Sequence, residues 1–364
     1  MVIKRVAAKA FVLILILMGL PLLGVWLAGF PPMQCLEFPP RTRYIEHAPF
    51  SPVAFFSYAL FILCGAFFLA GKIWHSPGRK HRRATAVHPF PIWGFLGLGS
   101  GLLFWFLAWT RFSWFGAFQL HTFTPLWLSF IVVVNALAYR RTGGCLLLDC
   151  PLYFLSLFPA SAVFWWFFEY LNRYVQNWYY TGVHFSTLEY ILYASISFST
   201  VLPAVASVHT WLTSFPRLTG DPNNRPAITR PFLKATAAIV LTLAGAGLLL
   251  IGIWPDYLFA WVWISPLLLV VGIQALSDGN DRLVTIWFGD WKTPASYALA
   301  ALVCGFFWEM WNFYSLAKWQ YSIPFVHTFS LFEMPLLGYA GYIPFGWECM
   351  VIITALDPKK RPSI

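Results

Sequence analysis

The chain has 364 residues, of which 59% are hydrophobic and 10% are charged, and its formal net charge is +10. Soluble globular domains carry about 25% charged residues, so this composition excludes an ordinary soluble protein and predicts an all-α polytopic membrane protein. The sequence holds no nucleic-acid-binding module and no run of Arg or Lys interleaved with surface aromatics, so we expect no nucleic-acid partner. The six cysteines form no C-x-x-C pair, which gives no support to a disulfide, haem or iron–sulfur protein.

Ten apolar stretches are long enough to cross the hydrocarbon core of a bilayer, which needs about 20 helical residues. They are residues 11–30, 52–71, 91–110, 121–139, 151–171, 188–213, 231–253, 257–276, 294–316 and 334–356. Lys4, Arg5 and Lys9 precede the first stretch, which is therefore either a cleaved signal peptide or a membrane anchor. Its apolar run is longer than that of a typical signal peptide, so we expect an anchor.

The basic residues predict how these helices are oriented, because the cytoplasmic loops of membrane proteins are rich in Lys and Arg. If the N-terminus is cytoplasmic, ten spans place 19 of the 24 basic residues on the cytoplasmic side. The others are Arg41, Arg43, Arg111, Arg173 and Lys318. The sequence therefore predicts a multi-pass protein of a bacterial inner membrane with both termini in the cytoplasm. The expected partners of its basic loops are membrane lipids.

Two stretches, residues 168–189 and 308–333, share one order of residues: Glu-x-x-Asn, Trp-x-Tyr, His and a second Glu. The offset between matched positions grows from 140 to 144 residues, as small loop insertions would make it. We therefore predict a parallel internal repeat within a single membrane domain. The first copy is 121–213, a cytoplasmic linker loop is 214–230, and the second copy is 257–356.

The first acid of each copy, Glu169 or Glu309, lies inside a predicted span and shares a helix face with Asn172 or Asn312. A carboxyl group inside a span is costly and by default marks a functional site. The surrounding aromatic residues favour the neutral carboxyl, which can donate a proton. We expect Glu169 and Glu309 to be an acid/base pair oriented by the two Asn residues, with water near the helix ends relieving part of the cost of burial. Glu348 is a third candidate, deeper in stretch 334–356 and without a counterpart in the first copy.

The other matched residues are candidates for substrate binding: Trp178, Tyr180, His184, Glu189, Trp319, Tyr321, His327 and Glu333. For Glu189 and Glu333, which begin predicted helices, a structural role is also open, because an acid in the first turn complements the helix dipole. The His and Glu residues together offer nitrogen and oxygen ligands for a hard metal. Their spacing matches no metal motif such as H-E-x-x-H, so we expect no metal and no other cofactor.

Three classes of function remain. An acid beside aromatic rings that stabilise a cation fits acid-started chemistry on a hydrophobic isoprenoid. The same residues fit a proton-coupled transporter of a lipid or small solute, or an assembly subunit that binds a pigment or quinone. An enzyme needs a closed pocket, whereas a carrier needs access from both faces. The absence of a Walker loop excludes ATP-driven transport by this chain alone, and the absence of G-x-S-x-G and D-D-x-x-D argues against hydrolase and prenyl-diphosphate chemistry.

Residues 305–349 contain Glu309-x-x-Asn312, then Trp319-x-Tyr321, then PLLGYAGYIPFGW at 335–347. This order resembles the small membrane lycopene cyclases and their carotenoid-hydratase relatives, which have an intramembrane Glu, a downstream aromatic–Tyr pair and a Gly/Pro-rich helix ending near a Trp. The resemblance implies a carotenoid-like substrate and an acid role for Glu309, and for Glu169 through the repeat. The paired Glu-Glu of that family is absent here. As a whole the chain resembles bacterial inner-membrane proteins, and this wider resemblance implies no particular function.

Overall fold

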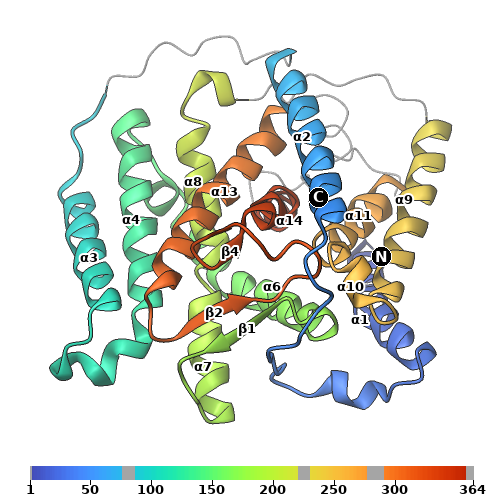
Figure 1. The fold of residues 1–364 in the computed structure, drawn as a ribbon. Coiled ribbons are helices and arrows are strands. Elements are labelled where there is room, and N and C mark those ends of the chain that lie inside the picture. Colours follow the sequence, from blue (N-terminus) through green and yellow to red (C-terminus); the bar gives the residue numbers. More distant parts are fainter. Residues whose placement is uncertain (1, 76–86, 220–229, 277–290, 358–364) are drawn as a thin grey trace.

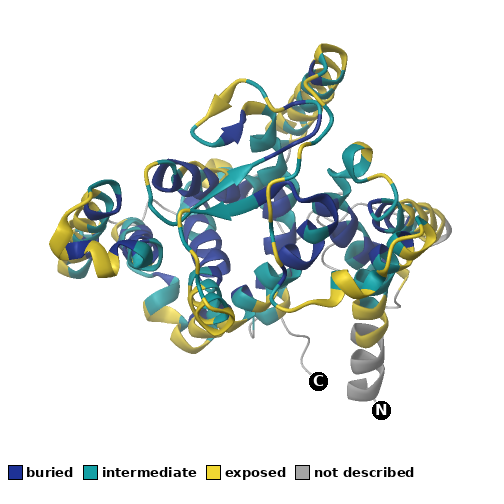
Figure 2. Cartoon of the chain, turned by 60° about the horizontal axis from the view of Figure 1, so that its bottom comes forward, coloured by how far each residue is buried: buried dark blue, intermediate teal, exposed yellow. Residues whose placement is uncertain are grey.

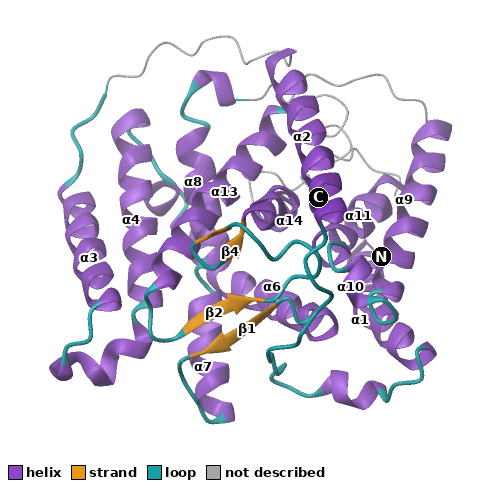
Figure 3. Ribbon diagram, in the orientation of Figure 1, coloured by secondary structure: helices purple, strands orange, loops and turns teal. Residues whose placement is uncertain are grey.

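The computed structural model describes residues 2–75, 87–219, 230–276 and 291–357. These residues form mainly helices, with two short two-stranded sheets between them (Figures 1 and 3). The α-helices are α1 (Val2–Leu27), α2 (Pro52–His75), α3 (Ile92–Trp109), α4 (Phe123–Thr142), α5 (Leu146–Asp149), α6 (Pro151–Val175), α7 (Thr187–Phe198), α8 (Val201–Leu212), α9 (Arg230–Leu250), α10 (Pro255–Leu258), α11 (Trp261–Leu276), α13 (Lys292–Phe313) and α14 (Tyr342–Leu356). The strands are β1 (Trp178–Thr181), β2 (Lys318–Tyr321), β3 (Ser330–Leu331) and β4 (Met334–Pro335), and the 3-10 helices are η1 (Pro32–Leu36), η2 (Ser113–His121), η3 (Pro216–Leu218) and η4 (Leu336–Gly341).

Seven helical segments of the described residues are long and apolar enough to cross a membrane, which indicates a multi-pass membrane protein. They are Pro52–His75, Ile92–Trp109, Phe123–Thr142, Pro151–Val175, Thr187–Leu212, Phe232–Leu250 and Leu336–Leu356. The apolar parts of α1 and α11 are shorter. Each of the ten predicted stretches contains a helix, so the all-α class is confirmed, while the count of ten spans stays a prediction.

Several of the predicted stretches are not continuous α-helices, and stretch 257–276 is divided between α10 and α11. Stretch 188–213 divides into α7 and α8, and Ser161 of α6 bridges the break: its hydroxyl donates to the Phe198 carbonyl (2.6 Å) and accepts from the Leu202 amide (3.0 Å). Stretch 334–356 begins with β4 and η4 before α14 starts at Tyr342. The prediction that Glu333 begins a helix is therefore wrong, because it lies in the turn between β3 and β4. In the predicted linker 214–230, residues 220–229 lie outside the described residues.

The helices form two outer groups around a buried centre (Figure 1). On one side α3 packs on α4, and α4 packs on α8; on the other, α9 packs on α1 and α11. Helix α13 packs on α8 and α14 between them, and α6 packs on α8. Figure 2 shows the buried residues gathered at this centre and the exposed residues on the outer helices, which places the most protected environment around α6, α13 and α14.

A two-stranded ribbon joins the ends of α6 and α13. Strand β1 follows α6, strand β2 follows α13, and the two pair antiparallel, with Trp178 opposite Tyr321 and Tyr180 opposite Trp319. The Trp of each Trp-x-Tyr pattern thus faces the Tyr of the other. The two strands therefore pair as two copies related by a local two-fold axis would pair, with each position of one pattern opposite the other position of its copy.

One glycine lets the ribbon form. Gly182 follows β1 with a φ of 87°, in the left-handed region that side chains other than glycine rarely adopt. A Cβ atom at this position would also collide with the carbonyl oxygen of Leu316, just before β2. The chain therefore leaves β1 at a point where only glycine fits.

Candidate functional site

Asn172 and Asn312 hold the two strands at matching places. The Asn172 amide donates to the Trp178 carbonyl (2.8 Å) and its oxygen accepts from the Trp178 N–H (3.4 Å). Asn312 makes the same pair of bonds with the backbone of Trp319, at 2.7 and 2.9 Å. Among the described residues neither amide bonds to a carboxyl group, so any orientation of the acids by the two Asn residues acts through the strands. They fix the start of each strand, and the strand side chains then reach the acids.

Glu169 is fully buried on α6, and protein donors surround one of its oxygens. Its Oε1 accepts from the indoles of Trp165 (3.1 Å) and Trp178 (3.0 Å) and from the hydroxyl of Tyr180 (2.6 Å). Its Oε2 has no hydrogen-bond partner among the described residues. Indole and phenol donors thus satisfy one oxygen of a fully buried acid.

Glu309 is also fully buried, on α13, but its donors are different. Its Oε1 accepts from the hydroxyls of Tyr321 (2.7 Å) and Tyr342 (2.9 Å). The indole of Trp319 donates to the Tyr321 oxygen (2.9 Å), so it supports the acid through the phenol. The Oε2 atom again has no partner among the described residues. In a neutral carboxyl group, this oxygen is the one available to carry the proton.

The strand tyrosines are suited to act as donors. Burial, followed by the charge of the neighbouring carboxyl group, raises the pKa of Tyr180 and of Tyr321 well above the ordinary value. Both phenols therefore keep their protons at neutral pH and can donate to Glu169 and Glu309.

A single large cavity adjoins both clusters. Its volume is about 1560 Å³, more than the roughly 300–1,000 Å³ of common small-molecule sites. Glu309 lines it, together with Tyr321 and Tyr342. Glu169 is not among the lining residues; its donors Trp165, Trp178 and Tyr180 line the cavity instead. The shared cavity thus presents the carboxyl residue of one cluster and only the donors of the other.

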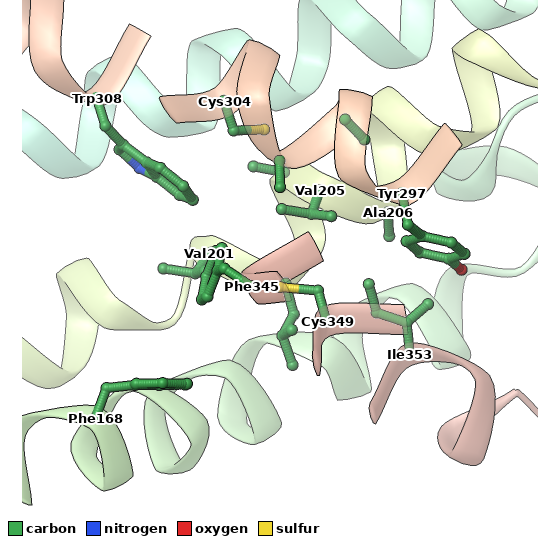
Figure 4. Close-up of a cluster of buried hydrophobic side chains, with 14 of the residues drawn as sticks. Phe168, Val201, Val205, Ala206, Tyr297, Cys304, Trp308, Phe345, Cys349 and Ile353 are labelled. Carbon is green, nitrogen blue, oxygen red and sulfur yellow. The ribbon is translucent and has the colours of Figure 1, made fainter. Parts of the chain in front are cut away.

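Phe345 of α14 packs between the two clusters. Its ring centroid lies 5.8 Å from that of Trp165 and 6.0 Å from that of Trp308, and the two tryptophan centroids are 6.4 Å apart. Figure 4 shows Phe345 between Trp308 and Phe168. These rings make one packed aromatic wall, and Trp165, Trp308 and Phe345 all line the cavity.

Three residues of this site were not singled out from the sequence. Trp165 stands one helical turn before Glu169, a spacing at which it could have been found. Tyr342 is 33 residues after Glu309 and Phe345 lies one turn further, so no local pattern connects them to the acid.

The second acid of each copy has a structural role. Glu189 is exposed and completes a capping box at the start of α7, where its carboxylate accepts from the Ser186 N–H and the Ser186 hydroxyl caps the helix. This agrees with the helix-end role left open above. Glu333 forms an ion pair with Lys318 of β2. Neither lines the cavity.

The remaining predicted residues are not gathered around Glu309. His184 and His327 are both exposed, and of the two only His184 lines the cavity. Glu348 is buried in α14, has no partner among the described side chains and does not line the cavity.

The described side chains form no candidate metal site, and comparison with known proteins found no match. Within residues 2–75, 87–219, 230–276 and 291–357, no three His, Cys, Asp or Glu side chains come together in a way that could hold a metal ion. No protein-family model, no curated protein and no solved structure matches this chain.

Proposed function

We propose that this chain is an integral membrane protein that binds a long, mostly apolar molecule in the cavity, and that Glu309 exchanges a proton with it. The observation that carries the proposal is a fully buried acid lining a cavity of about 1560 Å³ with aromatic walls. A buried acid contributes nothing to solubility. The sequence predicts a span at 294–316, although α13 is not among the seven apolar helices above, and an ionisable group inside a span is functional by default. The resemblance of residues 305–349 to carotenoid enzymes makes an isoprenoid or carotenoid-like alkene the preferred substrate class.

The chemistry follows from the geometry around Glu309. The acid proton on Oε2 passes to one alkene carbon, whose new C–H bond uses the π electrons and leaves a cation on the neighbouring carbon. The hydroxyls of Tyr321 and Tyr342 stabilise the carboxylate that forms, and ring faces of Trp308 and Phe345 stabilise the cation. Loss of a proton from an adjacent carbon back to the carboxylate restores the acid, so the balanced reaction moves a double bond. Where a second alkene of the same molecule first attacks the cation, its π electrons form the C–C bond of a ring and leave a new cation, which then loses the proton to the carboxylate.

The arrangement in the membrane belongs to the same proposal: ten spans, a parallel internal repeat, both termini in the cytoplasm and a bacterial inner membrane. Support comes from the helix within every predicted stretch, the two-fold exchange across β1 and β2, and the matching Asn172 and Asn312 bonds. Reporter fusions after residue 142 should report cytoplasm, and fusions at 183 and 325 should report the outer side. A cytoplasmic signal at 183 or 325 would contradict both the count of ten spans and the parallel repeat.

The functional test begins with the full chain purified in a mild detergent and with mass spectrometry of whatever lipid or pigment remains bound. The purified protein is then transferred to D₂O, and deuterium in carbon-bound positions of that compound is measured. We expect incorporation with the native chain and its loss in Glu309→Gln. The matched control is Glu348→Gln, since both acids are buried but only Glu309 lines the cavity. Undiminished incorporation in Glu309→Gln would exclude the proposed role.

Transport of a lipid or small solute is the second candidate, and the divided span favours it. Broken helices line the substrate sites of many transporters, and here Phe198 and Val201, on either side of the break between α7 and α8, both line the cavity. A carrier moves the bound compound across proteoliposomes without adding deuterium to its carbon atoms. The same purified protein, reconstituted in proteoliposomes, therefore distinguishes the two functions by whether the compound gains deuterium or crosses the membrane.

A further inference from the structure

One face of α2 forms a side wall of the cavity. The lining residues recur at intervals of three and four along the helix, as residues on one helical face do. They are Tyr58, Phe61, Ile62, Gly65, Ala66 and Leu69. This face is about 16 Å long at 1.5 Å per residue and carries no charged side chain.

The middle of α2 stands away from the rest of the protein. Near its start, Phe55 packs against Ile323 and Val326, and toward its end the ring of Phe68 lies 5.9 Å from that of Trp291. Between these points, a Cβ atom at Gly65 would find no heavy atom within 4 Å. Gly65 also lines the cavity, so the space beside this part of α2 is cavity rather than packed side chains.

The opposite wall of this space is also apolar. It includes Ile264 and Leu268 of α11 and Leu337 of η4, and the cavity continues from there to Tyr342 and Glu309. A molecule lying along α2 would touch hydrocarbon on both sides and reach the acid with one end.

The outer face of α2 is strongly apolar and exposed. Leu60 is 64% exposed, Leu63 54% and Phe67 76%, and none of the three lines the cavity. In a bilayer these side chains would contact lipid. A ligand behind α2 would thus be separated from the lipid phase by this sparsely packed helix.

We propose that the inner face of α2 is a binding site for one extended hydrocarbon chain, the tail of the ligand whose reacting end lies at Glu309. The ligand comes from the bilayer past α2 and not from water. This rests on the proposed function and narrows it to membrane-dissolved, single-chain substrates with an apolar tail of about 16 Å or more.

The test uses geranylgeraniol that carries a diazirine at its hydrocarbon end, added to the purified full chain and activated by light. Peptide mapping should place the label on α2 or on its facing residue Leu337. Gly65→Trp should lower labelling about tenfold, because its side chain occupies the ligand's volume. The matched control is Gly71→Trp, on the same helix, where a Cβ atom also has open space but which does not line the cavity. Ala66→Phe is a second blocking variant if Gly65→Trp does not fold.

The outcomes separate the tail site from the acid chemistry. Label on α2 that is lost in Gly65→Trp or Ala66→Phe and kept in Gly71→Trp supports the tail site, even if Glu309→Gln remains active. Label that is found on neither α2 nor Leu337, or that is equal in the blocking and control variants, overturns the tail site and leaves the role of Glu309 to its own test.

Discussion

The two carboxyl clusters have the same support but different surroundings. In both, an Asn at the helix end fixes a strand, and a strand Tyr donates to a fully buried Glu. Glu169 accepts from three donors and lies outside the cavity lining, whereas Glu309 accepts from two phenols and lines the cavity. One residue pattern thus builds the same scaffold twice, and Glu309 but not Glu169 is among the residues that line the cavity.

Loss of the shared scaffold should have the largest effect. Asn172→Ala removes three hydrogen bonds and Asn312→Ala removes two, and each leaves buried backbone groups unpaired, so each should lower the free energy of unfolding by about 3 kcal/mol. Denaturant unfolding in detergent measures this loss, and a variant of Ser186, the exposed N-cap of α7, should show a smaller effect. Destabilisation by only one of the two Asn variants would break the equivalence of the two clusters.

Gly182 offers a test of the ribbon that joins the clusters. Gly182→Ala should cost about 2 kcal/mol, because alanine disfavours a positive φ and its Cβ atom would meet Leu316. Gly116→Ala, where a Cβ atom has open space and the backbone is not left-handed, is the control. If both variants unfold at the same denaturant concentration as the native chain, the ribbon does not have the described geometry.

The strand tyrosines should show the difference between the clusters. Tyr321→Phe removes a donor from the acid that lines the cavity and should slow deuterium incorporation about tenfold, the effect of roughly 1.4 kcal/mol in the transition state. Tyr180→Phe removes the matching donor from Glu169 and should change the rate much less. Equal slowing in the two variants would mean that both acids take part.

The second acids should matter least. Ser186→Ala removes the N-cap of α7 and should lower the free energy of unfolding by about 1 kcal/mol without changing deuterium incorporation. A large loss of deuterium incorporation, measured at equal amounts of folded protein, would mean that Glu189 and its cap contribute to ligand binding.

The sequence predicted the helices well, because apolar stretches of about 20 residues have few other structures available in a membrane. It also found the matched Glu, Asn, Trp and Tyr residues, since each set lies within one short stretch. It missed Tyr342, whose bond to Glu309 depends on how α14 packs against α13. It also missed the break between α7 and α8, where Ser161 of another helix bonds to the backbone on both sides.

The central claim is that, of two matched acids, only Glu309 exchanges a proton with the ligand. Deuterium incorporation should therefore be compared in Glu309→Gln and Glu169→Gln, at matched amounts of folded protein and of bound compound. We expect Glu309→Gln to lose on the order of 100-fold or more of the rate, the usual contribution of a general acid, and Glu169→Gln to retain most of it. A full rate in Glu309→Gln, or an equal loss in both variants, would contradict the claim.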